Sequence, residues 1–174
     1  MKKISSYEIA LSALACAFAT IFLTVGVYST LLLFSGYLFA CIALMMPLAK
    51  KCYVGYALAY VGACLLSLIF SAAYFFDLLP FIMFFGLHPL VNELQLHIKI
   101  NRWIACAIKA VWFDGTMYVI WRFVFGMTAS IPIIDQYIIP IILVGGTAFF
   151  IVYDYLMYKW RFAINVLVKR ITRK

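Results

Sequence analysis

Apolar residues occupy most of this chain in long stretches, and the polar residues that interrupt them are grouped in a few short segments. A helix needs roughly 20 apolar residues to cross the hydrocarbon layer of a membrane. The apolar stretch 7–49 is too long for one crossing, and the segment 26–30 (GVYST) is suited to a turn. A lysine pair at 50–51 follows. This first part predicts two membrane-spanning helices, at about 7–26 and 30–49.

The rest of the chain predicts four further crossings by the same reasoning. Asp77 and Pro80 mark a turn, and a polar cluster containing Lys99, Asn101 and Arg102 marks the next one. The sequence MTASIPIID then forms a predicted loop before the last apolar stretch. The predicted helices cover about 53–74, Pro80 to about His97, 103–126 and 137–158.

Basic residues lie almost entirely on one side of this predicted arrangement. With six crossings, every Lys and Arg except Lys109 and Arg122 falls in segments that share a side with both termini. The loops on the opposite side, near 26–30, 75–79 and 127–136, contain no Lys or Arg. Because cytoplasmic loops carry an excess of these residues, the expected fold is an all-α integral membrane protein with six transmembrane helices and both termini cytoplasmic.

Composition supports this assignment. The chain is 68% hydrophobic and 11% charged, with a mean hydropathy of +1.08, which is more apolar surface than a soluble domain of 174 residues can bury. Residues 1–158 are predicted to form the transmembrane domain. Residues 159–174 form a basic tail, expected to lie on anionic lipid headgroups or to dock a protein.

The net charge of +8 and the five cysteines add no other class of function. Since membrane topology already explains the positive charge, nucleic acid is not an expected partner. The cysteines include no C-x-x-C pair, so neither a disulfide framework nor a metal site is indicated.

Small residues recur in two of the predicted helices. Helices in lipid associate through close packing, and small residues mark the contacting faces. The third predicted helix has a small residue every four positions, and the first has two alanine pairs at that spacing. Packing within the molecule explains both patterns, and for the first helix an external partner is the alternative. The residues are Gly55, Ala59, Ala63, Ser67 and Ser71 in the third helix, and Ala13 with Ala17 and Ala15 with Ala19 in the first.

A chain of this length with six predicted crossings and Ala-x-x-x-Ala in its first helix resembles the substrate-binding S component of energy-coupling factor (ECF) transporters. The resemblance implies an S-component-like bundle in the cell membrane of a bacterium. It also implies that Ala13 and Ala17, or Ala15 and Ala19 in the alternative register, contact a transmembrane coupling subunit attached to two ABC ATPases. The chain has no G-x-x-x-x-G-K-[ST] motif of its own for ATP.

Three charged residues stand within the predicted helix 103–126. An ionisable group at the centre of a membrane helix costs roughly 2.5–3.5 kcal/mol on insertion scales. Lys109 and Arg122 lie about 9 Å and 6 Å from the two helix ends, at 1.5 Å rise per residue, so their long side chains are expected to reach water. Asp114 lies about 16 Å deep and has a short side chain. It is therefore expected to be neutral, paired or facing a wet cavity.

His88, on the preceding predicted helix, also falls near the middle of the membrane, and a contact with Asp114 would satisfy both polar groups. An internal hydrogen bond without a ligand is the alternative. Asp114 also begins a stripe along one helical face that is typical of a pocket for a flat, small molecule, with Arg122 beside it for a carboxylate or phosphate. An aromatic belt at the membrane interface is the alternative explanation. The stripe consists of Asp114, Tyr118, Trp121 and Phe125.

The resemblance places substrate binding in the outward half of the later helices and their loops. By region, it adds Phe76, Asp135 and Gln136 to His88 and the helical stripe. It implies a membrane-embedded subunit that binds a vitamin-like or other small micronutrient for uptake, energised by a separate ATPase module. No cofactor is expected, and the lipid bilayer is the surrounding partner.

Two other classes of function compete with this expectation. A lipid-linked flippase, or an accessory membrane protein of envelope-polymer synthesis, would use Lys109 and Arg122 against a phosphate headgroup. An integral membrane enzyme would use His88 and Asp114 as an acid–base pair, but no nucleophile or metal-ligand cluster accompanies them. The sequence therefore predicts a protein that is not an enzyme.

Overall fold

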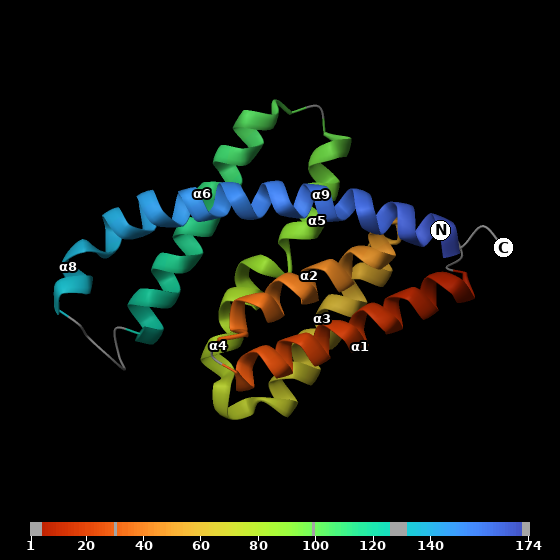
Figure 1. Ribbon diagram of the computed structural model, residues 1–174, viewed down its shortest axis with the longest axis horizontal. Helices are drawn as coiled ribbons and strands as arrows, with labels where there is room; N and C mark the ends of the chain where they lie inside the picture. The colour runs from red at the N-terminus through yellow and green to blue at the C-terminus, as the bar shows by residue number, and fades with distance from the viewer. Residues whose placement is uncertain (1–4, 30, 99, 126–131, 172–174) are drawn as a thin grey trace. The chain divides into compact units, whose positions relative to one another are not determined.

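Helices without strands make up the part of the chain that the computed structural model describes, residues 5–29, 31–98, 100–125 and 132–171 (Figure 1). The α-helices are α1 (Ser6–Tyr28), α2 (Leu33–Leu48), α3 (Tyr53–Phe70), α4 (Phe75–Pro80), α5 (His88–His97), α6 (Arg102–Ile120), α8 (Pro132–Pro140) and α9 (Thr147–Ile171). The 3-10 turn η1 (Ala72–Tyr74) and the π-helical segments η2 (Phe81–Phe85), η3 (Trp121–Phe125) and η4 (Ile141–Gly146) connect some of them.

Within the described residues, five helical stretches are long and apolar enough to cross a membrane. They are Ser6–Tyr28, Tyr53–Phe70, Ala72–His97, Arg102–Val124 and Gln136–Ile171. The remaining apolar helix, α2, has 16 residues and therefore a length of about 24 Å. These helices are those of a multi-pass membrane protein.

Local sequence signals fix where two of the helices begin. The hydroxyl of Ser5 accepts a hydrogen bond from the Glu8 N–H, and the Glu8 carboxylate accepts one from the Ser5 N–H, which together form a capping box for α1. The side chain of Asn101 accepts from the Trp103 N–H, 3.0 Å away, at the start of α6. Both caps satisfy backbone N–H groups that have no partner inside the helix.

Three boundaries differ from the sequence prediction. The predicted turn at Asp77 and Pro80 is helical, because α4 and η2 continue through it. Of the predicted loop before the last crossing (127–135), residues 127–131 lie outside the described residues, and 132–135 are helical because α8 begins at Pro132, where proline is favoured in the first turn of a helix. The predicted basic tail is not separate in backbone structure, since α9 continues without a break to Ile171.

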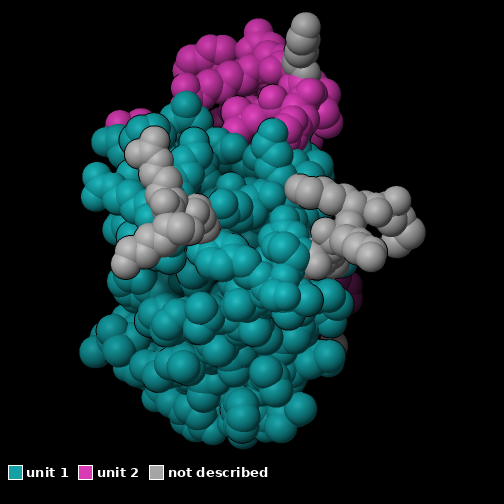
Figure 2. Space-filling view, turned by 90° about the vertical axis from the view of Figure 1, so that its right-hand side faces the viewer, with its two compact units in different colours: residues 1–94, 157–174 teal, residues 95–156 magenta. Residues whose placement is uncertain are grey.

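The chain divides into two compact units (Figure 2). The first comprises residues 1–94 and 157–174, and the second comprises residues 95–156. The helix α9 contributes its beginning to the second unit and its end to the first.

Glycines allow α1 to pack closely against α2 within the first unit. A Cβ added to Gly36 of α2 would lie 2.7 Å from the carbonyl oxygen of Phe22 and 3.0 Å from the Cα of Gly26, both on α1. Backbone therefore meets backbone at this crossing, as expected for helices that associate in lipid through small residues. Packing of α1 against α3 follows the same rule, because a Cβ on Gly55 would meet the hydroxyl of Ser12.

Candidate functional site

Polar side chains join α6 to α9 inside the second unit. The Lys109 ammonium donates to the Asp154 carboxylate over 2.6 Å, and the two side chains are 5% and 19% exposed. The expectation that Lys109 reaches water at the membrane surface was therefore wrong. Asp154 of α9, which the sequence analysis did not single out, is the partner of Lys109. Pairing lowers the cost of burying a charge that the apolar surroundings would otherwise oppose.

Asp114 makes the second polar link between these helices. The hydroxyl of Thr147, the first residue of α9, donates to Oδ2 of Asp114 over 2.8 Å. The other carboxylate oxygen, Oδ1, is buried and has no hydrogen-bond partner among the described residues, and Asp114 as a whole is only 8% exposed. One of the two oxygens is therefore enclosed without a hydrogen-bond donor among the described residues.

Aromatic side chains pack between the two polar links. The ring of Phe113 stacks on those of Phe149 and Phe150, with centroid distances of 6.0 Å and 5.7 Å. Lys109, Phe113 and Asp114 follow one another along α6. Their partners on α9 come in the reverse order, from Asp154 through Phe150 and Phe149 to Thr147. The two helices are therefore antiparallel at this interface, and stacked aromatic rings lie between its two polar links.

The backbone next to Oδ1 of Asp114 is irregular, and its nearest residue, Gly146, carries no side chain. The π-helical segment η4 follows Pro140 and ends in Gly145 and Gly146. A Cβ on Gly146 would lie 3.1 Å from Oδ1 of Asp114, whereas a Cβ on Gly145 would have no atom within 4 Å. Gly146 therefore presents bare backbone to Oδ1, and side-chain atoms of Phe113 and Ile142 also lie within 4 Å of such a Cβ. π-Helical turns occur preferentially at functional sites.

A second polar region lies in the first unit, where the helix from Ala72 to His97 changes register. Pro80 and Pro89 lack an N–H, and the Gly86 N–H donates to the Phe81 carbonyl in the π register over 2.8 Å. Several carbonyls thus lose the donor that an α-helix would provide. In an apolar environment each unsatisfied carbonyl costs several kcal/mol.

Side chains from α2 and α3 supply donors to these carbonyls. The Cys41 thiol donates to the Phe85 carbonyl over 3.0 Å, and this is the carbonyl that Pro89 cannot serve. The Tyr60 hydroxyl donates to the Ile82 carbonyl over 2.6 Å. The Ile82 carbonyl needs this donor because the Gly86 N–H is directed to Phe81 instead.

Two more tyrosines act in the same way. The Tyr56 hydroxyl donates to the carbonyl of Gly86, which lacks its helical donor because the Leu90 N–H bonds to Leu87. The Tyr37 hydroxyl donates to the carbonyl of Asp77, since the N–H of Phe81 bonds to Leu78. Irregular backbone inside a membrane protein is tolerated where neighbouring side chains satisfy it in this manner.

The Tyr56→Phe variant tests this account. Removing the hydroxyl leaves a buried carbonyl without its donor, and we expect a loss of about 1–3 kcal/mol in the free energy of unfolding. Unfolding in mixed detergent micelles measures the loss. The matched control is Tyr74→Phe, which removes an exposed hydroxyl and keeps the ring that packs edge-on against Tyr28. Equal stability of the two variants would contradict the role of Tyr56.

His88 begins α5, directly after this region, and is fully buried. Its ring lies 5.3 Å from that of Phe84, and its Nδ1 is 3.4 Å from the side-chain nitrogen of Asn92. His88 belongs to the first unit and Asp114 to the second. The contact between these two residues stays a prediction.

The other predicted pocket residues are more exposed than Asp114. Tyr118, one helical turn beyond it, is 42% exposed, and Trp121 is partly buried. The side chains of Phe125 and Asp135 lie outside the described part of the chain. Exposed side chains are those of Arg122, Gln136 and Phe76.

The two alanine pairs of α1 face different ways. Ala15 and Ala19 are completely buried, whereas Ala13 and Ala17 are exposed. Only the pair Ala13–Ala17 is thus open to another molecule in the isolated chain. Its position follows from the helical period, which places residues 13 and 15 on different sides of the helix.

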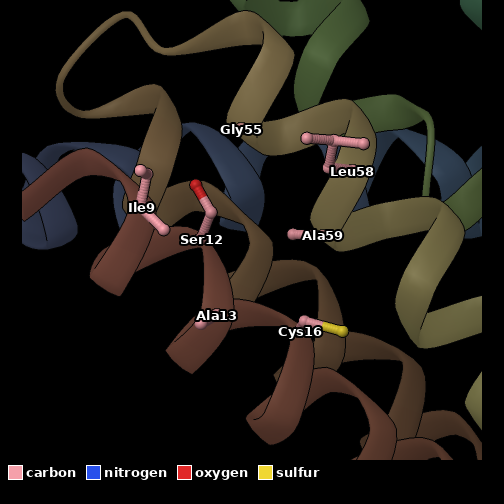
Figure 3. Close-up of a pocket in the computed structure, with 7 residues that line it drawn as sticks. All are labelled: Ile9, Ser12, Ala13, Cys16, Gly55, Leu58 and Ala59. Atoms are coloured by element: carbon pink, nitrogen blue, oxygen red, sulfur yellow. The ribbon is translucent and has the colours of Figure 1, made fainter. Parts of the chain in front are cut away.

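Ala13 also lines a hollow between α1 and α3, with a volume of about 230 Å³ (Figure 3). Figure 3 shows Ser12 and Cys16 of α1 facing Gly55 and Ala59 of α3. This hollow is a groove that exists because most of its lining side chains are small. Ile9 and Leu58 are the two larger residues that line it. The lining residues are Ile9, Ser12, Ala13, Cys16, Gly55, Leu58 and Ala59.

A further ion pair ties the basic end of α9 to α5. Glu93 accepts from Arg161 over 2.6 Å, and the glutamate side chain is 6% exposed. Arg161 belongs to the segment 159–174 that the sequence analysis assigned to the basic tail, so this ion pair connects the tail to α5 within the first unit.

The sequence interpretation missed Thr147, Gly146 and Asp154, which form the α9 side of the interface. One signal was present for Asp154, namely an acidic residue in the last apolar stretch that can balance Lys109 in the preceding one. No comparable signal marks Thr147 or Gly146, because neither is unusual in a membrane helix. Comparison with protein-family models, with curated proteins and with solved structures found no match for this chain.

Proposed function

We propose that this protein is a membrane-embedded substrate-binding subunit for uptake of a vitamin-like or other small micronutrient. It crosses the bacterial cell membrane six times with both termini in the cytoplasm, and a separate ECF-type ATPase module energises it. The observation that carries the proposal is the buried carboxylate of Asp114, whose Oδ1 has no partner among the described residues and faces Gly146. Ionisable groups of this kind within a membrane mark substrate or ion pathways.

The groove between α1 and α3 supports the second half of the proposal, which is docking to a coupling subunit. It is open, apolar and lined by small residues, so the backbone of a partner helix can approach it closely. The exposed pair Ala13 and Ala17 lies on the same helix. Of the two possible alanine registers, the proposal uses this one.

Bulky residues at these two positions test the docking. We expect Ala13→Leu/Ala17→Leu to reduce at least tenfold the ABC ATPase that co-purifies with the full-length chain from membranes of its own host. The reason is that two leucines hold the partner helix away from the groove. Quantitative mass spectrometry of the eluate, together with its ATPase activity, measures the effect.

The matched control is Ala107→Leu, which enlarges an exposed alanine on α6, outside the groove. It should leave the amount of ATPase unchanged. If the double variant retains as much ATPase as Ala107→Leu, the docking part of the proposal is wrong.

Small molecules released from the purified chain test the binding part. We expect mass spectrometry to find a water-soluble compound that is present with the wild type and with Ala13→Leu/Ala17→Leu. A phospholipid or polyprenyl phosphate in its place would instead support the flippase or envelope-polymer function.

A further inference from the structure

The charges at the α6–α9 interface do not balance. Lys109 and Asp154 neutralise each other at 2.6 Å, while Asp114 contributes a second negative charge. Thr147 donates one hydrogen bond to Asp114 but carries no charge. The described side chains of this interface therefore leave one buried carboxylate uncompensated. An unpaired ion is costly in an apolar medium, so a positive charge is favoured at this position.

The two cations nearest to Asp114 along this helical stretch, Arg122 and Lys109, cannot supply this charge. Arg122 is eight residues beyond Asp114, a rise of about 12 Å, and its side chain is exposed. Lys109 is already held by Asp154. The compensating charge must come from a proton or from a bound cation.

The side chains around Asp114 indicate which kind of cation could bind there. The described residues contain no group of three or more His, Cys, Asp or Glu side chains that could hold a metal ion. A single carboxylate oxygen suits a nitrogen that donates a charge-assisted hydrogen bond. Tyr118 lies one turn further along α6, where an aromatic face can contact a cation or a flat ring.

We infer that Oδ1 of Asp114 binds a protonated nitrogen of the transported compound, on the side where Gly146 carries no side chain. This inference deepens the proposed function and rests on it. The class of substrate is an organic cation, such as an amine or a protonated nitrogen heterocycle. A carboxylate or phosphate would meet repulsion from Asp114.

Four variants distinguish the effect of the charge on Asp114 from the effect of the missing side chain at Gly146. Asp114→Asn removes the charge with little change in shape. Gly146→Ala keeps the charge and places a Cβ 3.1 Å from Oδ1, and its matched control is Gly145→Ala, whose Cβ meets nothing within 4 Å. Glu8→Gln removes a carboxylate elsewhere and retains the capping box, since glutamine also serves at that position.

The probes are benzylamine, benzyl alcohol and benzoate, which share a ring and differ in charge. They are added in a concentration series to the full-length chain in nanodiscs at pH 7 and constant ionic strength, and the melting temperature is measured. We expect saturating benzylamine to raise it by about 2–4 °C for the wild type, Gly145→Ala and Glu8→Gln. For Asp114→Asn and Gly146→Ala, and for the two other probes, we expect no shift.

Several results would overturn the inference. They are a larger shift with benzoate, an equal shift with benzyl alcohol, or a benzylamine shift that survives in Asp114→Asn. So would the absence of any benzylamine shift, as expected if a proton occupies the carboxylate. Replacing K⁺ by Na⁺ must give no Asp114-dependent shift, because such a shift would assign the position to sodium. None of these results alters the co-purification of an ATPase, so the proposed function is judged separately.

Discussion

The Asp154→Asn variant is expected to lose about 3–5 kcal/mol in the free energy of unfolding, the range found when one partner of a buried ion pair is removed. The Lys109 side chain is 5% exposed, so water cannot replace the lost carboxylate. Asparagine can still accept a hydrogen bond from the ammonium but does not balance its charge. Lys109 must then stay buried and charged, lose its proton, or pull away from the α6–α9 interface.

A double-mutant cycle distinguishes loss of the pair from loss of a side chain. The double variant Lys109→Met/Asp154→Leu replaces both charges with apolar groups of similar volume, and we expect it to recover most of the lost stability. Glu8→Gln, which removes a half-buried carboxylate at the start of α1 and retains the capping box, should change stability little. If the effects of Lys109→Met and Asp154→Leu simply add in the double variant, the two residues do not act as a pair.

Gly36→Ala is expected to have the second large effect. The added Cβ would lie 2.7 Å from the Phe22 carbonyl oxygen and 3.0 Å from the Cα of Gly26. Both are backbone atoms, so no side chain can turn away to relieve the contact. The helices α1 and α2 must separate, and overpacking of this kind costs about 1–3 kcal/mol, sometimes more. Unfolding in mixed detergent micelles again measures the loss.

Gly115→Ala is the matched control, because a Cβ at that helical position meets no atom within 4 Å. There the better helix propensity of alanine should stabilise the protein by up to about 1 kcal/mol. The two substitutions are chemically identical and are expected to have opposite signs. A neutral Gly36→Ala would mean that α1 and α2 do not cross where the structure places them.

The helical segments of the membrane region were largely predictable from the sequence. Their signal is the length of each apolar stretch measured against the thickness of a membrane, which does not depend on any partner. The prediction failed at Pro80, where a turn was expected. Proline ordinarily ends a helix in water, but here the helical backbone continues through it. In a membrane the cost of leaving the helical state is higher, and donors such as the Tyr37 hydroxyl satisfy the carbonyls that the irregular backbone exposes.

The candidate site was predictable only in part. The sequence singled out Asp114, because a short acidic side chain in the middle of an apolar stretch needs an explanation. It could not indicate Gly146 as the residue beside Oδ1, because glycine is common in membrane helices for many reasons. Nor could it show that Lys109 is paired rather than hydrated, since a lysine side chain six residues into a helix is long enough for both.

The sequence by itself thus determined that this chain is helical and built for a membrane, and which residues are costly to bury there. The tertiary structure alone decided which partners meet those residues. The physical reason is that these helices are apolar nearly all round, so hydrophobic periodicity does not indicate which face packs inward. The small-residue stripe of α3 marks a buried face but does not identify the helix that packs on it. In lipid that choice depends on close contacts such as Gly26 with Gly36, and on polar pairs such as Lys109 with Asp154, which exist only once the helices have packed together.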